Sequence, residues 1–235
     1  MTELLYQVDS YLREFEAVVT EVVGDGVVLD QSGFYPGGGG QPCDVGRLLF
    51  DGGEWNVVKV GRKDGRVVHR LDGDPPPVGA RLRGVLDWER RYALMRTHTA
   101  MHVLCGVIWR DYEASVTGGK MELLRGRMDF EFERMQRELV SEIEEKINVE
   151  VAAARPVSTR ILEREEAFRI PDLIRTKINL LPPQIAQVRV VEIEGLDLQA
   201  DGGTHVANTS KVGALRIVDY KSKGRINKRL VVELV

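Results

Sequence analysis

The chain has 235 residues, of which 43% are hydrophobic and 29% are charged, and its formal net charge is −3. The small negative charge excludes a protein that coats nucleic acid by bulk charge. No apolar run approaches membrane-spanning length, and the first residues become polar too quickly for a signal peptide. Two cysteines, Cys43 and Cys105, are too few for a disulfide framework. We therefore expect a soluble, cytoplasmic protein, and its length suits two modest domains.

Residues 14–87 consist of short β-runs separated by turn signals. The runs include residues 17–19, 27–29 and 57–60, and Asp-Gly turns begin at Asp25, Asp51 and Asp64. Several short strands at this spacing are typical of a small β-barrel. A Pro-rich break at 72–77 precedes a closing strand at 80–86, which places a domain boundary near Asp87 and predicts an N-terminal β-barrel domain over residues 1–87.

After the boundary the apolar spacing becomes helical, with a helix expected from Glu89 to about Trp109. The further expected elements are a strand at 127–133, a helix at 135–151 with the apolar stripe Leu139, Ile143 and Ile147, a short helix at 163–168, and strands at 187–193, 214–220 and 229–234. The fold class is therefore α+β. Residues 88–235 are expected to form an α/β sandwich, with helices packed on a largely antiparallel sheet.

Two short patterns about a hundred residues apart hold three of the four histidines. His98 and His102 are four residues apart on the expected helix, so both imidazoles project from one face. Asp201 and His205 lie in a Gly-rich loop between two expected strands. Three imidazoles and one carboxylate would make a four-ligand site suited to zinc.

Each pattern also has a structural reading. The helical histidine pair could be stacked beside a core, and Asp201 could cap the Gly-Gly turn that follows it. The C-terminal stretch 211–235 carries seven basic and two acidic residues. It could contact phosphates, or it could be a solvated strand face.

Four segments together resemble the AlaX proteins, which are free-standing relatives of the alanyl-tRNA synthetase editing domain. They are Asp87–Leu104 with its two histidines, Gly202–Ser210, Ser222–Arg229 and the Gly-rich Phe34–Pro42, which is similar to a motif of the medium-length form. The resemblance covers nearly the whole chain, from about Phe15 to Val235.

The resemblance implies trans-editing, which is hydrolysis of the ester that joins a wrong amino acid to alanine tRNA. Serine is the chief candidate for this amino acid, and glycine is a second candidate. The resemblance implies one zinc ion held by His98, His102, Asp201 and His205. The ion could activate a metal-bound water as the attacking group or polarise the ester carbonyl, or, if four protein ligands close its shell, it could hold the geometry of the site or the substrate amino group. The family usually has cysteine where this chain has Asp201, and a hard carboxylate admits other divalent ions. Thr99 and Thr117 are candidates for orienting water or reading the serine hydroxyl.

The resemblance also implies contacts to the acceptor end of the alanine tRNA, and neither DNA nor a membrane is an expected partner. Candidate substrate-binding residues are Gly37, Gly38, Gly39, Gly40, Gln41 and Lys120, the last standing where glutamine is expected. Candidate tRNA-binding residues are Lys221, Lys223, Arg225 and Lys228.

Two other functions remain open alongside the serine-specific hydrolase. Asp201 and Lys120 depart from the family pattern, which would suit a metal-bearing tRNA-binding or regulatory module with weakened catalysis. A deacylase for another mischarged tRNA, such as a threonyl one, is the second alternative. The sequence leaves the oligomeric state open between monomer and homodimer.

Overall fold

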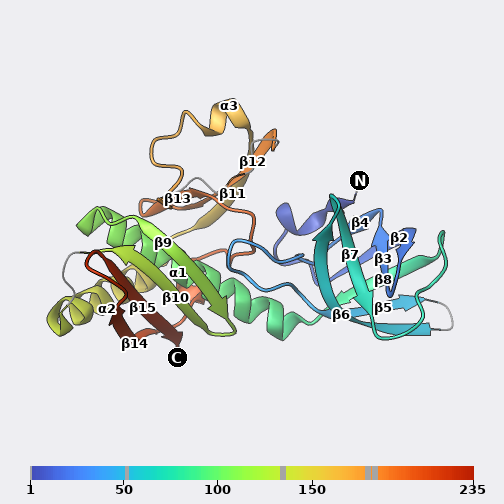
Figure 1. Ribbon diagram of the computed structural model, residues 1–235, viewed down its shortest axis with the longest axis horizontal. Coiled ribbons are helices and arrows are strands. Elements are labelled where there is room, and N and C mark those ends of the chain that lie inside the picture. Colours follow the sequence, from blue (N-terminus) through green and yellow to red (C-terminus); the bar gives the residue numbers. More distant parts are fainter. Residues whose placement is uncertain (1, 51–52, 133–135, 178–180, 182–184) are drawn as a thin grey trace. The chain divides into compact units, whose positions relative to one another are not determined.

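The computed structural model (Figure 1) describes residues 2–50, 53–132, 136–177, 181 and 185–235. The chain divides into two compact units, Met1–Ala93 and Leu94–Val235. Four residues on which predicted elements depended, Asp51, Gly52, Glu133 and Met135, lie outside the described residues. Within the described ranges, no helix is both long enough and apolar enough to span a bilayer.

The first unit is a closed barrel, as predicted. Its six strands are β2 (Glu14–Val23), β3 (Gly26–Leu29), β5 (Gly46–Phe50), β6 (Gly53–Lys63), β7 (Arg66–Leu71) and β8 (Arg81–Leu86), joined in the order β2-β3-β7-β6-β5-β8. Neighbouring strands are antiparallel. The short strands β1 (Glu3–Leu4) and β4 (Gln31–Ser32) pair in parallel outside the barrel, and the 3-10 helix η1 (Leu5–Gln7) follows β1. Alternating side chains such as Phe15, Leu48 and Leu82 fill the interior.

His69 on β7 is completely buried in this barrel. Its Nε2 lies 2.7 Å from the Ser32 hydroxyl and its Nδ1 lies 3.3 Å from the Val27 carbonyl oxygen, so both ring nitrogens have partners. Burial lowers the pKa of His69 from 6.5 to about 4. His69 is therefore a neutral structural histidine at physiological pH.

The second unit has an α+β fold, in agreement with the predicted class. Helix α1 (Trp88–Tyr112) begins within the first unit, and helix α2 (Arg137–Ala152) follows later in the chain. Both accompany an antiparallel sheet with the strand order β14-β15-β10-β9. Its strands are β9 (Val116–Glu122), β10 (Arg125–Glu131), β14 (Leu215–Ser222) and β15 (Asn227–Leu234). A second antiparallel sheet contains β11 (Val157–Glu163), β12 (Gln187–Ile193) and β13 (Asp197–Ala200). The short helices are α3 (Arg164–Ala167) and η2 (Thr209–Lys211).

Two glycines allow α1 to lie close to both sheets. A Cβ on Gly126 of β10 would collide with the Met101 sulfur of α1. A Cβ on Gly106 of α1 would lie 2.8 Å from Leu196 Cγ, in the turn between β12 and β13. Because any larger side chain would separate these elements, Gly126 fixes the distance of the histidine-bearing helix from β10, and Gly106 fixes its distance from the β12–β13 turn.

The apolar stripe of α2 differs by one residue from the predicted one. The structure buries Val140, Ile143 and Ile147, whereas Leu139 is half-buried. A spacing of three then four residues follows the 3.6-residue turn more closely than two successive steps of four. Asn148 then joins α2 to β14, because its amide donates to and accepts from the backbone of Leu215 at 2.8 and 2.9 Å.

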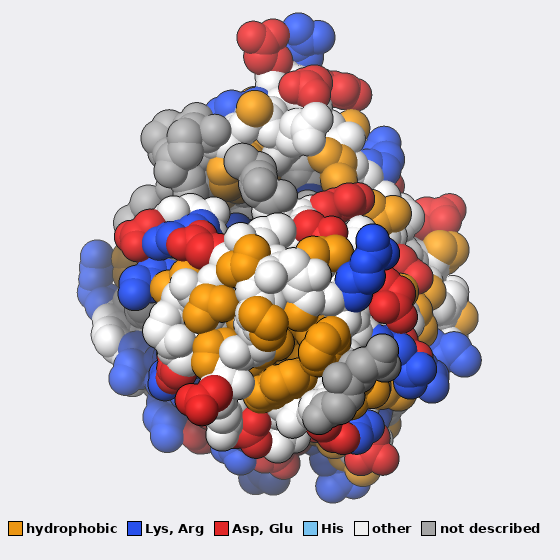
Figure 2. Space-filling view, turned by 90° about the vertical axis from the view of Figure 1, so that its right-hand side faces the viewer, with side chains coloured by type: hydrophobic (Ala, Val, Ile, Leu, Met, Phe, Trp, Pro, Cys, Tyr) orange, Lys and Arg blue, Asp and Glu red, His pale blue; other side chains and the backbone are white. Residues whose placement is uncertain are grey.

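Figure 2 shows a face on which hydrophobic side chains gather at the centre, with both acidic and basic side chains at the margin. Large exposed hydrophobic residues of the barrel unit include Val22, Phe50, Val58 and Val78. Among the described side chains of this view, charges of both signs are mixed, so these side chains create no single-sign field that would attract phosphates.

Candidate metal centre

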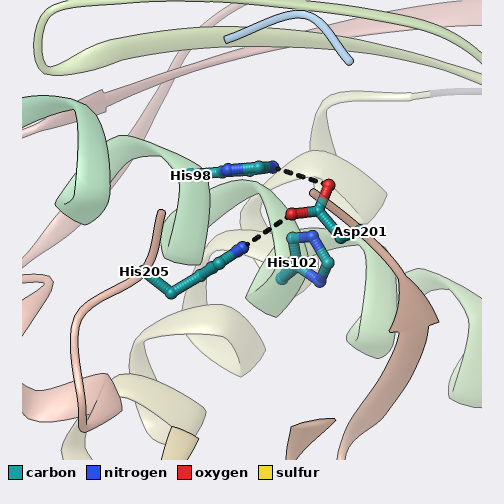
Figure 3. A group of neighbouring side chains, drawn as sticks. All are labelled: His98, His102, Asp201 and His205. Carbon is teal, nitrogen blue, oxygen red and sulfur yellow. Dashed lines mark hydrogen bonds and ion pairs between the residues drawn. The ribbon is translucent and has the colours of Figure 1, made fainter. Parts of the chain in front are cut away.

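The two helical histidines come from the middle of α1, where they lie one turn apart on the same side (Figure 3). His98 and His102 are 4% and 6% exposed, and their ring centroids are 5.1 Å apart. The helix has no glycine or proline before Gly106, so its geometry is regular where the histidines stand. Two buried imidazoles at this spacing can share one ion.

The loop that follows β13 brings Asp201 and His205 to the same place. Arg189 of β12 holds this loop, because its Nη1 donates to the carbonyl oxygens of Asp201 and Gly203 at 3.1 and 2.8 Å. The Gly203 amide donates to Asp201 Oδ1 at 2.7 Å. Asp201 thus caps the glycine turn and also faces the histidines, so its two suggested roles coexist.

The four side chains converge on one point. The candidate ligand atoms of His98, His102, Asp201 and His205 all lie within 4.8 Å of one another. His205 Nε2 is 3.0 Å from Asp201 Oδ1, and His98 Nε2 is 3.4 Å from Asp201 Oδ2 (Figure 3). Atoms bound to a tetrahedral zinc lie roughly 3.4 Å apart. The set of donors and its spacing therefore fit a divalent cation that accepts nitrogen and oxygen ligands.

Contacts behind the imidazoles set which ring nitrogen faces the centre. His102 Nδ1 donates to Asp197 Oδ2 at 2.9 Å, which leaves Nε2 as the free lone pair. His205 Nδ1 is 3.2 Å from the Thr99 hydroxyl, which also accepts from the Val206 amide at 3.2 Å. Thr99 therefore supports His205, a histidine of the group, from behind.

Two of the four side chains, Asp201 and His205, have charge states that suit a cation site. Burial, together with the neighbouring His98, lowers the pKa of His205 well below its usual value. Burial alone would raise the pKa of Asp201, but His98 and His205 outweigh it and hold the pKa of the carboxyl well below its usual value. For His102 burial opposes protonation, yet the Asp197 carboxylate outweighs it and raises the pKa. At neutral pH the group offers an anionic carboxylate and a neutral His205.

Cys105 lies one turn beyond His102 but does not join the group. It is buried, and burial together with the negative charge of Asp197 raises the pKa of its thiol well above the usual value. The thiol therefore stays protonated, whereas a cysteine ligand must be a thiolate. Cys105 is therefore a small packing residue on α1.

Thr117 and Lys120 lie on β9, outside the group of four. Both are exposed. The Thr117 hydroxyl donates to Asn227 Oδ1 at 3.3 Å, and Lys120 pairs with Glu122 at 3.3 Å. Their predicted contacts to substrate stay predictions.

The Gly-rich segment belongs to the barrel unit. Gly37, Gly38, Gly39 and Gly40 all have positive φ angles, of 80°, 136°, 55° and 91°, a conformation that side chains disfavour. The backbones of Gly38 and Gln41 exchange hydrogen bonds of 3.1 and 2.9 Å, which closes a tight turn. The Gln41 side chain is buried.

A buried ion pair holds the base of this turn. Arg91, which is 0% exposed, donates through Nε to Asp44 Oδ2 at 2.9 Å and through Nη2 to the Gly33 carbonyl at 2.6 Å. The same Asp44 oxygen accepts from the Tyr35 amide at 2.7 Å. The segments before and after the glycines are thereby fixed to one charged pair, so the loop is short and tethered at both ends.

The basic candidates lie in and beside the hairpin between β14 and β15. Lys223 and Arg225 are exposed, and Lys221 is exposed and paired with Asp219 at 2.9 Å. Lys228 differs, because it is 6% exposed and its ammonium donates to the carbonyls of Gly224 and Arg225 at 2.8 and 2.9 Å. The structure thus places Lys228 inside the turn that presents Arg225.

Asp197 and Arg189 are two supporting residues that the motifs did not reveal. One signal was present, since Asp197 and Gln199 alternate with Leu198 and Ala200 along β13. A strand with one polar face beside a predicted ligand loop indicates hydrogen-bond partners for that loop. Arg189 had no comparable signal, because arginine on a strand is ordinarily a surface residue.

Comparisons with known proteins match both units. Residues 6–90 match the family model of class II (A) tRNA synthetases, and residues 188–231 match that of the threonyl and alanyl tRNA synthetase second additional domain. The chain is 40% identical to the alanyl-tRNA editing protein AlaX-M of Methanosarcina acetivorans over the whole of both chains, and 39% identical to that of Saccharolobus solfataricus over 98% of each. It is also 42% identical, over 92% of its length, to 25% of the alanine–tRNA ligase of Pyrobaculum neutrophilum. The chain therefore belongs to the AlaX-M family of alanyl-tRNA editing proteins.

Proposed function

We propose that this chain is a free-standing hydrolase that deacylates mischarged alanine tRNA, chiefly tRNA charged with serine, with the help of a divalent cation, zinc in the first place. One observation carries the proposal: the convergence of His98, His102, Asp201 and His205 within 4.8 Å. The names of the full-length relatives support the tRNA substrate.

The chemical demand is modest, because an aminoacyl ester is already labile. The site has to place a water against the ester carbonyl and stabilise the negative charge that develops on its oxygen. A bound zinc ion supplies Lewis-acid chemistry, by acidifying water or by polarising the carbonyl. The protein holds Asp201 anionic and His205 neutral, and Thr99 fixes the orientation of His205. Thr117 is a candidate for orienting water or the serine hydroxyl.

We assign different tasks to residues 1–87 and 88–235. In the first part, the backbone amides of the Gly37–Gly40 turn can approach the acceptor end closely, because no side chains stand in the way. In the second part, the metal site performs hydrolysis, while Lys221, Lys223 and Arg225 contact phosphates. The cytoplasm, where tRNA is charged, is the expected place of action.

Specificity for serine over alanine follows from the chemistry of hydroxyl recognition. A pocket that selects alanine cannot strongly reject an added hydroxyl, whereas a pocket that hydrogen-bonds the hydroxyl rejects a substrate without it. We therefore expect serine-charged tRNA to be cleared and alanine-charged tRNA to be spared. Glycine-charged tRNA, which lacks the hydroxyl, should be a weaker substrate.

The test is deacylation of serine-charged alanine tRNA by the purified chain. Combining His98→Ala with His205→Ala should lower kcat/KM at least ~100-fold, equivalent to ~2.7 kcal/mol of barrier. Arg160→Ala is a suitable control, since this exposed residue of β11 pairs with Glu192 of the neighbouring strand β12 and does not belong to the group of four. Undiminished turnover by the double variant would exclude the metal-site mechanism.

The weakened-module alternative is favoured by Asp201, whose carboxylate already accepts from the Gly203 amide and faces His98 and His205. It predicts tRNA binding with no measurable hydrolysis, so clear turnover by the wild-type chain removes it. Parallel assays with serine-charged threonine tRNA separate the threonyl alternative from the alanine one.

A further inference from the structure

A buried carboxylate stands directly behind one of the candidate ligands. Asp197, the first residue of β13, is 4% exposed. Its Oδ2 lies 2.9 Å from His102 Nδ1 and accepts a second hydrogen bond from Gln199 Nε2 at 2.7 Å. An ionised carboxylate can only accept hydrogen bonds, so this contact requires a proton on His102 Nδ1. In a neutral imidazole the lone pair is then on Nε2.

Arg175 determines how this carboxylate is oriented. Its Nε lies 3.7 Å from Asp197 Oδ1, the oxygen that does not contact His102. The guanidinium is held over the Trp109 ring at 4.5 Å, and its side chain is only 11% exposed. A buried anion needs a nearby cation. Arg175 supplies this cation next to Oδ1, so the other carboxylate oxygen, Oδ2, remains turned toward His102.

We propose that Asp197 is a positioning residue that fixes His102 in the Nδ1–H form, with Arg175 and Gln199 holding the carboxylate in place, and thereby sets the affinity of the four-residue centre for a divalent cation. The proposal rests on the metal site of the proposed function. It extends that site by three residues that make no contact with the ion.

A purely structural role for Asp197 makes a different prediction. If Asp197 served only to neutralise Arg175, its loss would change stability and leave the histidine unaffected. A positioning role requires a change in the ring-nitrogen protonation of His102 and in cation affinity. Both can be measured without the hydrolytic reaction.

Asp197→Asn is the sharpest variant, because it keeps the shape and removes the charge. The Arg175 guanidinium attracts the single amide oxygen, which leaves the amide NH2 group against His102 Nδ1. That nitrogen must then accept, and the ring proton moves to Nε2, where it blocks the ligand position. Asp197→Ala leaves His102 without a partner, so both ring forms are available and a smaller effect is expected.

The experiment measures zinc affinity of the purified full chain by competition with a chromophoric chelator. Asp197→Asn should weaken zinc binding about 10- to 100-fold, the range found when the hydrogen-bond partner of a ligating histidine is lost. Asp197→Ala should weaken it less. Asp219→Asn is the matched control, since this residue on β14 pairs with Lys221 at the surface and the change should leave affinity unaltered.

A second readout uses 15N shifts of the His102 ring in metal-free protein at alkaline pH, where the imidazole is neutral. The wild type should show a protonated Nδ1, and Asp197→Asn should show a protonated Nε2. If Asp197→Asn fails to fold because Arg175 keeps only Asp172, 3.9 Å away, as a counter-charge among the described residues, the double variant Asp197→Ala with Arg175→Gln removes that charge and carries the same measurements. In this double variant His102 has lost its carboxylate partner, so zinc affinity should fall as in Asp197→Ala and the Nδ1–H form should no longer predominate.

Two results overturn the proposal: wild-type zinc affinity in the folded variants, or an unchanged His102 ring signature. If the wild-type chain itself binds no zinc, the proposed metal site is wrong and this inference falls with it. If the wild type binds zinc and the variants bind it equally well, only the role of Asp197 is wrong.

Discussion

The barrel and the second unit both bury histidine, and they use it in opposite ways. In the barrel, His69 stands alone and both of its nitrogens contact protein groups, Ser32 and the Val27 carbonyl. In the second unit, three imidazoles and a carboxylate turn toward one another. Burial alone is therefore no sign of a site. The informative feature is that several buried polar groups converge on one point, while other groups support them from behind.

The same contrast holds for the buried carboxylates. Asp44 is neutralised within the barrel by Arg91, a pair that is 0% and 1% exposed at its side chains. The carboxylate of Asp201 faces histidines, whereas Arg189 donates to the backbone carbonyl oxygen of this residue. We therefore expect changes in the barrel to alter stability, and changes around Asp201 to alter metal binding.

The largest expected effect is on the barrel. Arg91→Ala leaves Asp44 as an unpaired buried charge, so the free energy of unfolding should fall by about 3–5 kcal/mol. Urea titration followed by tryptophan fluorescence measures it, with the exposed Arg83→Ala, whose partner is Glu14, as control. If the free energy of unfolding falls by less than about 1 kcal/mol, as expected for the control, the Arg91–Asp44 pair does not stabilise the fold.

The next effect concerns pH and His69. Its pKa is about 4 in the folded state against 6.5 in the unfolded one, so the unfolded chain binds the proton more readily. The stability contributed by the neutral ring is complete above pH 6.5, and roughly 3 kcal/mol of it is lost as the pH falls to about 4. Unfolding free energies at several pH values should show this slope in the wild type and not in His69→Gln. Equal slopes in both chains would contradict the assignment.

A smaller effect is expected at the fourth ligand. Asp201→Cys exchanges a hard oxygen for a soft thiolate, so zinc affinity should rise, by about tenfold or more, while Asp201→Ala should lower it. Chelator competition on the purified variants measures both. If neither variant differs from the wild type, Asp201 is a turn cap and no ligand.

The smallest effect is at the basic hairpin. Lys223→Ala and Arg225→Ala should weaken tRNA binding modestly and lower the slope of log affinity against log salt by about one each. Lys228→Ala should act through the turn instead, because its ammonium is bound to backbone carbonyls. A salt slope that none of these variants changes would place the tRNA elsewhere.

Much of the fold could be predicted from local signals. Asp-Gly turns and alternating apolar residues indicated the barrel, and the unbroken helical spacing around His98 indicated α1. Strand β9 was missed because its Thr117-Gly-Gly-Lys120 stretch has little β-propensity, and pairing with β10 overrides it. Strand β13 has only four residues, so its alternation is too short to stand out.

The site was predictable in part for the same reason. The spacing of His98 and His102 on a helix places them together, and the Asp201-x-x-x-His205 pattern in a Gly-rich loop indicated the other two ligands before the resemblance assigned all four to one zinc ion. Asp197 and Arg189 depend on which strands meet the ligand loop, and that is a tertiary property. Lys228 shows the converse, since a count of charges cannot distinguish an exposed ammonium from one that closes a turn.

The most direct test of the metal centre is X-ray absorption spectroscopy of the zinc-loaded chain. The geometry predicts a first shell of three imidazole nitrogens and one carboxylate oxygen at about 2.0–2.2 Å, with the multiple scattering of histidine rings. A sulfur scatterer at about 2.3 Å would mean that Cys105 or Cys43 binds the ion. That result, or a shell without histidine, would contradict a centre built from His98, His102, Asp201 and His205.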